Sequence, residues 1–367
     1  MVDKSSDTLE GLRANIDDID GKILSLLQDR AHLAEKVAGV KQSEAGSETA
    51  VFYRPEREAQ VLRALMARNE GPLHDETVAK IFREVMSACL ALEAPMKVAY
   101  LGPEGTFTHG AALKHFGHAV ETVSLSTIDE VFREVQSGVA RYGVVPVENS
   151  AQGMVNHTLD CFMEYDLNIC GEVSARIHHN LLVSPTTKLD NVTRVYAHEQ
   201  ALAQCRKWLD GRYPGIERIS VNSNAEAAKR VQGEWNAVAI GPEMAAELYG
   251  LSIVAENIED NPQNTTRFLV VGTDTILPSG SDKTSAIISI RDKPGGLLEV
   301  LQPFEAANVS LSRLETRPDT STGTWGYVFF VDFDGHIEDD NIRSVIEDVK
   351  KLSVGVRVLG SYPQAVL

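Results

Sequence analysis

The stretch ILSLLQDRAHLAEKV, residues 23–37, reads as part of a long helix. Apolar residues recur through it and on both sides of it in steps of three and four, the spacing of a helix that packs lengthwise on partner helices. They are Leu9, Leu12, Ile16, Ile19, Ile23, Leu26, Leu33, Val37 and Val40. At residue 30 the same pattern requires an apolar side chain, but the chain has Arg30. The pattern predicts a helix of about 33 residues that ends near Lys41, with one guanidinium in its apolar seam.

Length and composition describe a multidomain globular protein. The chain has 367 residues, which favours two or three domains. Its 35 basic and 52 acidic residues give a net charge of −17, which disfavours binding to nucleic acid or to acidic membranes. The four cysteines have no metal-ligand spacing. No signal-like apolar core is present, and no run approaches the roughly 18 apolar residues of a membrane span. We therefore expect a cytoplasmic protein.

The hydrophobic pattern of the sequence changes twice along the chain. Residues 5–95 have helical patterns throughout, with a second helix in PEREAQVLRALMARNE and a third in DETVAKIFREVMSACLALE. In residues 96–273 short apolar runs alternate with helical patterns, which predicts an α/β fold with a mainly parallel sheet. The segments VAYLGPEGTFTHGAA and AVAIGPEMAAELYG both read as strand, Gly-Pro-Glu and helix. This echo predicts two similar lobes with a ligand cleft between them.

The last third of the chain has the pattern of a small regulatory fold. Residues 274–284, rich in Gly, Ser and Pro, are predicted to form a linker. Residues 285–363 then follow the order strand, helix, strand, strand, helix, strand. This is the ferredoxin-like βαββαβ unit.

The basic residue in the apolar seam has a geometric explanation. Lys41 follows Arg30 by 11 residues, so the two lie on about the same face of the helix, ~16 Å apart. Arg13 lies ~25 Å before Arg30 and is rotated away, so it can reach the same ligand only from a second copy of the chain. Arg57, which Glu58 follows, is a fourth cation at the start of the second helix, and a pocket lined by these four cations suits a small dianion. The alternative is that Arg30 sets helix register or extends its charge to solvent.

Three sets of motifs resemble known families. LRANIDDIDGKILSLLQDRAHLAEKVAGVK and RPERE resemble the all-helical chorismate mutases. YLGPEGTFTHGAA, VVPVENS, GEVSARIHHNLLV and NTTRF resemble prephenate dehydratases, and KPGGLLEVL with SRLETRP resembles ACT domains that bind phenylalanine. In this order the chain resembles the bifunctional chorismate mutase–prephenate dehydratase family over nearly its whole length. The resemblance implies a three-helix mutase in an intertwined dimer, a two-lobed α/β dehydratase like periplasmic binding proteins, and an α+β ACT domain.

The activity that this resemblance implies has two steps. Chorismate rearranges to prephenate, which then loses CO₂ and water to give phenylpyruvate. The resemblance implies no cofactor and no metal. It further implies feedback inhibition by L-phenylalanine and a homodimer or a higher homo-oligomer.

The resemblance also assigns roles to the basic residues of the helical segment. Arg13 of the second copy, Arg30 and Arg57 would hold the two carboxylates of chorismate. Lys41 would donate a hydrogen bond to the ether oxygen, and Glu58 would accept one from the ring hydroxyl.

Two positions of the helical segment depart from the enterobacterial pattern. Glu93 stands where that pattern has a Gln that donates to the ether oxygen, and Cys89 stands where it has Ser. An ionised Glu cannot donate a hydrogen bond, whereas a protonated one can. We predict that the mutase needs Glu93 in its neutral form. The alternative is that Glu93 is only a solvated carboxylate at the end of a helix.

The resemblance places the second reaction around NTTRF. Thr266 is the residue that it implies is essential for dehydration, as a hydrogen-bond donor to the leaving hydroxyl or as a proton relay. The turn after the first strand offers hydroxyls and backbone N–H groups at a helix start, a usable carboxylate site. The further residues predicted to bind prephenate are Thr106, Thr108, Glu148, Asn149, Ser150, Arg267 and Phe268. Strand alternation puts His178 and His179 on opposite faces, so at most one faces the cleft, and we expect a structural role for either.

Two segments of the last domain resemble the phenylalanine site of ACT domains. In that site the amino acid lies between two paired domains, and glycine N–H groups can bind its carboxylate. The residues concerned are Gly295, Gly296, Leu297 and Leu298, and Glu315, Thr316, Arg317 and Pro318. The alternative is that the glycines only start a helix and that the second segment is a solvated strand face.

Two other functions compete with this interpretation. The first is a dehydratase that acts on arogenate; the helical segment and the lack of a transit peptide count against it. The second is a non-enzymatic two-lobed binding protein with an amino-acid sensor, in which the helices only form a dimer.

Overall fold

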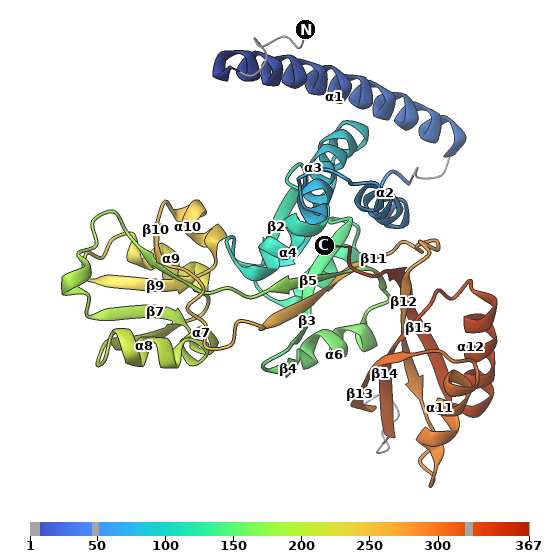
Figure 1. The fold of residues 1–367 in the computed structure, drawn as a ribbon. Coiled ribbons are helices and arrows are strands. Elements are labelled where there is room, and N and C mark those ends of the chain that lie inside the picture. Colours follow the sequence, from blue (N-terminus) through green and yellow to red (C-terminus); the bar gives the residue numbers. More distant parts are fainter. Residues whose placement is uncertain (1–7, 46–50, 320–325, 367) are drawn as a thin grey trace.

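The computed structural model describes residues 8–45, 51–319 and 326–366. Residues 5–7, with which the predicted helical domain begins, lie outside this range. Helix α1 is the long helix that extends across one end of the molecule (Figure 1). The helices of this segment are α1 (Leu9–Ala45), α2 (Pro55–Ala67) and α3 (Asp75–Glu93). The predicted long helix is confirmed and continues four residues beyond its expected end at Lys41.

Helix α1 packs on α3 with a different stripe from the apolar seam. Ala31, Ala34, Ala38 and Lys41 are the half-buried or buried residues of its C-terminal half, besides Arg30. Their spacing of three and four places them along one face. All nine seam residues from Leu9 to Val40 stay between 47% and 67% exposed. Among the described residues of the single chain, an apolar stripe of this length is left without a partner.

The first lobe of the α/β region is built on a sheet in the order β2-β1-β3-β11-β5, with β4 paired to β3. Strand β1 is parallel to β2 and β3, whereas β11 is antiparallel to β3 and β5. The strands are β1 (Lys97–Leu101), β2 (Glu121–Leu125), β3 (Tyr142–Asn149), β4 (Gly153–Met154), β5 (Asn168–Arg176) and β11 (Thr265–Gly272). The helices are α4 (Phe107–Phe116), α5 (Ile128–Gln136) and α6 (Asn156–Glu164).

The second lobe has a sheet in the order β10-β6-β9-β7-β8. Its strands are β6 (Asn180–Val183), β7 (Arg194–His198), β8 (Glu217–Val221), β9 (Ala237–Gly241) and β10 (Ser252–Ala255). Its helices are α7 (Glu199–Gln204), α8 (Arg206–Arg212), α9 (Asn224–Val231) and α10 (Glu243–Tyr249), with a 3₁₀ turn at Leu189–Asn191.

The prediction of two lobes is confirmed, whereas the prediction of a mainly parallel sheet is wrong. The two echoing segments form β1–α4 in the first lobe and β9–α10 in the second. In both sheets about half of the strand pairs are antiparallel. The reason is that the chain crosses between the lobes twice: β11 returns from the second lobe and inserts between β3 and β5.

The last domain has the predicted βαββαβ order. Its sheet runs β13-β14-β12-β15, and all its pairs are antiparallel. The elements are β12 (Asp282–Ser289), α11 (Gly296–Ala306), β13 (Leu311–Asp319), β14 (Gly326–Asp334), α12 (Asp340–Leu352) and β15 (Gly355–Pro363). Strand β12 begins inside the segment predicted as a linker.

This last domain shares a hydrophobic core with the first lobe. One face of its sheet is covered by α11 and α12 (Figure 1). From the other face Ile287, Phe330 and Leu359 join the cluster that contains Ile169 and Leu269 of the first lobe. At Gly360 the contact is so close that a Cβ atom would lie 2.3 Å from the carbonyl oxygen of Ile169. The domain is therefore fixed on the lobe by backbone-level packing.

Candidate active sites

The first candidate site lies between α1 and α3. The Nζ of Lys41 donates to the carbonyl of Phe52 at 2.9 Å and lies 3.3 Å from Oε2 of Glu93. The Nη1 of Arg30 lies 3.5 Å from the carbonyl oxygen of Val85 on α3. The spacing argument from the sequence is thus confirmed, because Arg30 and Lys41 share the face of α1 that meets α3.

The departures from the enterobacterial pattern lie at this same contact. Cys89 is buried and stands one helical turn before Glu93, on the same side of α3. The Glu93 side chain is mostly buried and forms an ion pair with Lys41. Glu93 and Lys41 therefore lie together at the contact of α1 and α3.

Other predicted residues of this site lie elsewhere in the single chain. Arg13 is exposed in the N-terminal half of α1, and Arg57 is exposed on α2. Glu58 turns toward Arg83, with 3.2 Å between its Oε1 and Nε of Arg83. Adjacent residues of a helix point about 100° apart, so Arg57 and Glu58 cannot face the same side. The structure does not bring Glu58 to Lys41.

Glu58 instead joins a buried cluster where the helical segment meets the first lobe. Burial raises the pKa of Glu58 to about 7, although Arg83 opposes the shift. Nearby, the hydroxyl of Tyr53 and Nε2 of His115 are 3.1 Å apart. Burial, reinforced by Arg83, lowers the pKa of His115 to about 3, so this histidine is neutral.

The second candidate site is a cleft of about 200 Å³ between the two lobes. Thr266 reaches it from the start of β11 and is only 8% exposed. The Nδ2 of Asn149, at the end of β3, donates to the hydroxyl oxygen of Thr266 at 2.7 Å. The other lining residues are Leu101, Gly102, Thr106, Phe107, Thr108, Gln152, Ile177, His179, His198, Gln200, Ala201, Gln204, Asn222, Ser223 and Asn224.

Helix N-termini from both lobes open onto this cleft. Thr106 caps α4, and its hydroxyl accepts from the N–H of His109 at 3.4 Å and donates to the carbonyl of Pro103 at 2.9 Å. Ser223 caps α9 in the second lobe by accepting from the N–H of Glu226 at 3.0 Å. Free N–H groups and the helix dipole favour anions at such ends. The cleft therefore suits a ligand with carboxylates.

The neighbouring residues His178 and His179 have different surroundings, and only one of the two lines the cleft. The ring of His179 lines the cleft, with Nε2 2.7 Å from Oε1 of Gln204, and burial lowers its pKa. The Nδ1 of His179 is buried and has no partner among the described residues. His178 points away, to within 2.9 Å of Glu259. Both residues lie between β5 and β6 and in neither strand, so the predicted strand alternation is wrong, but of the two only His179 lines the cleft, as expected.

Sequence reasoning missed the contribution of the second lobe to the cleft. His198 is the last residue of β7 and Gln200 follows it, and Asn222 and Asn224 follow the carboxyl end of β8. Ligands of open α/β sheets bind at the carboxyl ends of the strands. This rule, applied to the predicted strands, could have identified these residues.

Four residues predicted to bind prephenate are not among those that line the cleft. Arg267 points to the opposite face of β11 from Thr266, because side chains alternate along a strand. Phe268 is 1% exposed in the core beneath α4. The hydroxyl of Ser150 donates to Oδ1 of Asn264 at 3.3 Å and accepts from the N–H of Thr265 at 3.0 Å. Glu148 on β3 is paired with Arg267 on β11.

The predicted phenylalanine segments occupy the start of α11 and the strand β13. Gly295 adopts a left-handed conformation (φ 81°) before the first helical residue, Gly296. Leu298 is exposed, and Leu297 packs on the domain core. Glu315, Thr316 and Pro318 lie on the edge strand β13. Arg317 is not free, because its guanidinium binds Asp160 of α6, with Nε 2.9 Å from Oδ1.

Comparisons with known proteins agree with this arrangement. Residues 12–94 match the family Chorismate mutase type II, residues 98–276 match Prephenate dehydratase, and residues 284–351 match the ACT domain. A protein of Stutzerimonas stutzeri named bifunctional chorismate mutase/prephenate dehydratase is 58% identical over 99% of each chain. One of Pseudomonas aeruginosa with the same name is 58% identical over 98% of this chain and 99% of its own.

The solved structures support the same assignment for the last two domains. The prephenate dehydratase of Arthrobacter aurescens in complex with L-Phe is 34% identical and has a TM-score of 0.67. The similarity covers 73% of this chain and 90% of that one. The three matched segments, in this order and over the full length, show that the chain belongs to the family of bifunctional chorismate mutase/prephenate dehydratases.

Proposed function

We propose that the two sites act in turn on one carbon skeleton. Chorismate rearranges to prephenate at the contact of α1 and α3, and prephenate loses CO₂ and water in the cleft at Thr266. The observation that carries the second assignment is the nearly buried Thr266 hydroxyl, which Asn149 orients into a cavity that helix N-termini also face. Full-length similarity to proteins named for both activities favours this function over the arogenate and non-enzymatic alternatives.

The first reaction needs conformer selection and charge, and it needs no proton transfer. As the ether bond breaks, its oxygen becomes electron-rich, and a cation beside it lowers the barrier. The Lys41 ammonium is the proposed donor, because it is held on a rigid contact of two helices. Arg30, about three turns away on the same face, would hold a carboxylate at the other end of the ligand.

The mutase site needs a second copy of the chain to be complete. Arg13 lies ~25 Å from Arg30 along a single straight helix, so it belongs to another copy's site. The exposed seam of α1 supports a homodimer, because its nine apolar side chains would be covered by a partner helix. Arg57, which is exposed beside this region, would complete the set of cations.

In the second reaction aromatisation drives the loss of two groups. The C–C bond to the ring carboxylate breaks and CO₂ leaves. The bonding electrons enter the ring as the ring hydroxyl leaves, and that hydroxyl takes up one proton and departs as water. Thr266 would donate this proton or relay it from solvent. The N–H groups at the start of α4, with Thr108 beside them, would hold the side-chain carboxylate.

L-Phenylalanine is the proposed ligand of the ACT domain. The N–H groups at Gly295 and Gly296 begin an 11-residue helix, which suits the carboxylate of an amino acid. Strand β13 is an edge strand, paired only with β14 among the described strands, and two ACT domains could pair through its outer side. The L-Phe complex of the Arthrobacter aurescens dehydratase supports this choice of ligand.

The test follows chorismate loss and phenylpyruvate formation separately in purified protein with chorismate as sole substrate. Wild type should give both signals. Arg30→Ala should abolish chorismate loss and still dehydrate added prephenate, whereas Thr266→Val should consume chorismate and accumulate prephenate. Loss of both activities in either variant, with the fold intact by circular dichroism, would contradict the division into two sites.

A further inference from the structure

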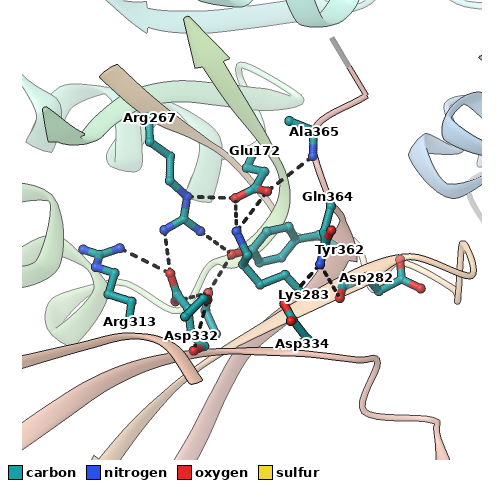
Figure 2. A network of polar contacts seen from close by, with 12 residues as sticks. Glu172, Arg267, Asp282, Lys283, Arg313, Asp332, Asp334, Tyr362, Gln364 and Ala365 are labelled. Carbon is teal, nitrogen blue, oxygen red and sulfur yellow. Dashed lines mark hydrogen bonds and ion pairs between the residues drawn. The ribbon is translucent and has the colours of Figure 1, made fainter. Parts of the chain in front are cut away.

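Arg267 lies at the centre of a polar network between the dehydratase and the ACT domain (Figure 2). Its Nε donates to Oε2 of Glu172 on β5 at 2.8 Å. Its Nη1 donates to Oδ2 of Asp332 on β14 at 2.5 Å, and its Nη2 donates to the hydroxyl oxygen of Tyr362 on β15 at 2.9 Å. One guanidinium on β11 is thus bonded to one strand of its own lobe and to two strands of the ACT domain.

The partners of Arg267 are themselves held in place. Ser285 of β12 donates to Oδ1 of Asp332 at 2.6 Å and lies 2.7 Å from the hydroxyl of Tyr362. Lys283 of β12 donates to Oε2 of Glu172 at 2.9 Å. The Glu172 and Asp332 side chains are only 8% and 7% exposed. A guanidinium fork fits such a set of fixed acceptors, and a single ammonium cannot reproduce it.

The sequence position of Arg267 links this network to the dehydratase cleft. Arg267 directly follows Thr266, and the two side chains leave β11 on opposite faces. Next to them the pairing with β3 is irregular: Arg267 is opposite Glu148 and Phe268 is opposite Pro146, so Val147 is extra. The bulged strand is β3, and the bulge lies two residues before Asn149, which donates to the hydroxyl oxygen of Thr266. The direction of Thr266 therefore depends on how β11 is held against β3 at this point.

We propose that Arg267 is a positioning residue of the dehydratase, which holds Thr266 in its reactive orientation by anchoring β11 to the ACT domain. Through the contact of Arg267 with Asp332, binding of phenylalanine to the ACT domain changes the orientation of Thr266 in the cleft. The proposal rests on the roles assigned above to Thr266 and to phenylalanine. Its physical basis is that the charged hydrogen bond from Arg267 to the nearly buried Asp332, at 2.5 Å, is lost if the two strands slide apart, although Asp332 also lies 3.4 Å from Nη1 of Arg313. A shift of β14 relative to the lobe must therefore be followed by β11 or break the pair.

The first experiment compares Arg267→Met, Arg267→Lys and the control Arg357→Met in the full chain. Arg357 also joins the two domains, donating to the carbonyl oxygens of Phe162 and Tyr165, but these follow or end α6 and not β11. Arg267→Met should lower the dehydratase kcat about tenfold or more with KM changed less than about threefold, and Arg267→Lys should fall between it and wild type. Arg357→Met should stay within about twofold, and mutase activity should be unchanged in all three.

The second experiment tests Asp332 with phenylalanine. Binding of labelled phenylalanine is measured by equilibrium dialysis, and dehydratase inhibition is measured in parallel. Asp332→Asn should still bind phenylalanine but should show a smaller maximal inhibition than wild type. Arg267→Met with Asp332→Asn should be no slower than Arg267→Met, because the two residues act as one unit.

Three results would overturn the proposal: an Arg267→Met kcat within about twofold of wild type, an equal loss in Arg357→Met, or normal inhibition in Asp332→Asn. Failure of the wild type to bind phenylalanine would instead refute the proposed ACT ligand, and the first experiment would still decide the role of Arg267. If Thr266→Val retained full dehydratase activity, the assigned role of Thr266 would fail independently.

Discussion

Single residues in this protein owe their roles to the neighbours that folding gives them. Thr266 and Arg267 are adjacent in sequence, yet one faces the cleft and the other the ACT domain. Glu58 stands beside Arg57 in a mutase motif, but in the single chain it is buried against Arg83. A motif therefore identifies a residue's chemistry, and the packing of its element determines which group it meets.

The first prediction concerns Glu93. An ionised Glu93 would hold Lys41 in an ion pair and would repel the electron-rich ether oxygen, whereas a protonated one can donate to that oxygen. Glu93→Gln is neutral and can donate to that oxygen, so its mutase kcat/KM should be at least as high as that of wild type. Mutase kcat/KM is measured for both proteins under the same conditions. A variant that is about tenfold slower or more would contradict the prediction.

The second prediction concerns the buried carboxyl of Glu58. Its folded-state pKa of about 7 lies above its ordinary value of 4.5, so the folded protein holds this proton more tightly than the unfolded chain. The stability that this group contributes is fully present below about pH 4.5 and is lost as pH rises to about 7. Relative to wild type, Glu58→Gln should gain up to about 3 kcal/mol in unfolding free energy across this range. Denaturant unfolding near pH 5 and pH 8 measures it. A pH-independent difference between the two proteins would refute it.

At the scale of elements, α1 shows how one helix serves two partners. Its Ala31, Ala34 and Ala38 stripe lets α3 approach closely, and its apolar seam remains exposed. The heptad-like spacing in the sequence predicted the helix correctly. That its seam packs on partner helices stays a prediction, because the seam residues are exposed in the single chain. The spacing could not predict the alanine stripe that meets α3, because small residues give a weak hydrophobic signal.

The third prediction tests the seam. Ile16→Lys places a charge in the stripe proposed to meet a second copy, and Ala14→Lys places the same charge on the opposite, exposed face of the same turn. Ile16→Lys should shift the protein toward monomer and lower mutase activity at least about tenfold, because the partner's Arg13 is lost. Ala14→Lys should leave both unchanged. Sedimentation velocity and the mutase assay measure the two effects. An Ile16→Lys protein that stays dimeric and active would show that the seam is not the interface.

At the scale of the whole molecule, the three domains are joined by direct packing and hydrogen bonds as well as by the chain that connects them. Arg63 of α2 donates to the carbonyl oxygens of Ser281, just before β12, and Gln364, just after β15. The ACT sheet rests on the first lobe and shares its core. In the described residues no helix is both long and apolar enough to cross a membrane.

The fourth prediction addresses the contact of the ACT sheet with the lobe. Gly360→Ala would put a Cβ atom 2.3 Å from the carbonyl oxygen of Ile169, so β15 must move away from β5. Overpacking of this kind costs about 1–3 kcal/mol. The melting temperature and the dehydratase rate should both fall, and mutase activity should be kept. Gly355→Ala on the same strand meets no atom within 4 Å and is the control. Equal effects of the two substitutions would contradict this role of Gly360.

The sequence by itself determined the three segments, the order of the elements in the last one, and some of the polar residues at both sites. These are Arg30, Lys41 and Glu93 at the contact of α1 and α3, and Thr106, Thr108, Asn149 and Thr266 in the cleft. These follow from short-range patterns: helical spacing, strand alternation, turn residues and motifs a few residues long. Tertiary structure decided which residues meet across long stretches of chain. It places His179, His198 and Asn224 in the same cleft as Thr266. Arg267 and Arg317 form contacts between domains. Glu58 contacts Arg83 and not Lys41. The physical reason is that such contacts depend on the relative placement of whole elements, which local periodicity does not encode.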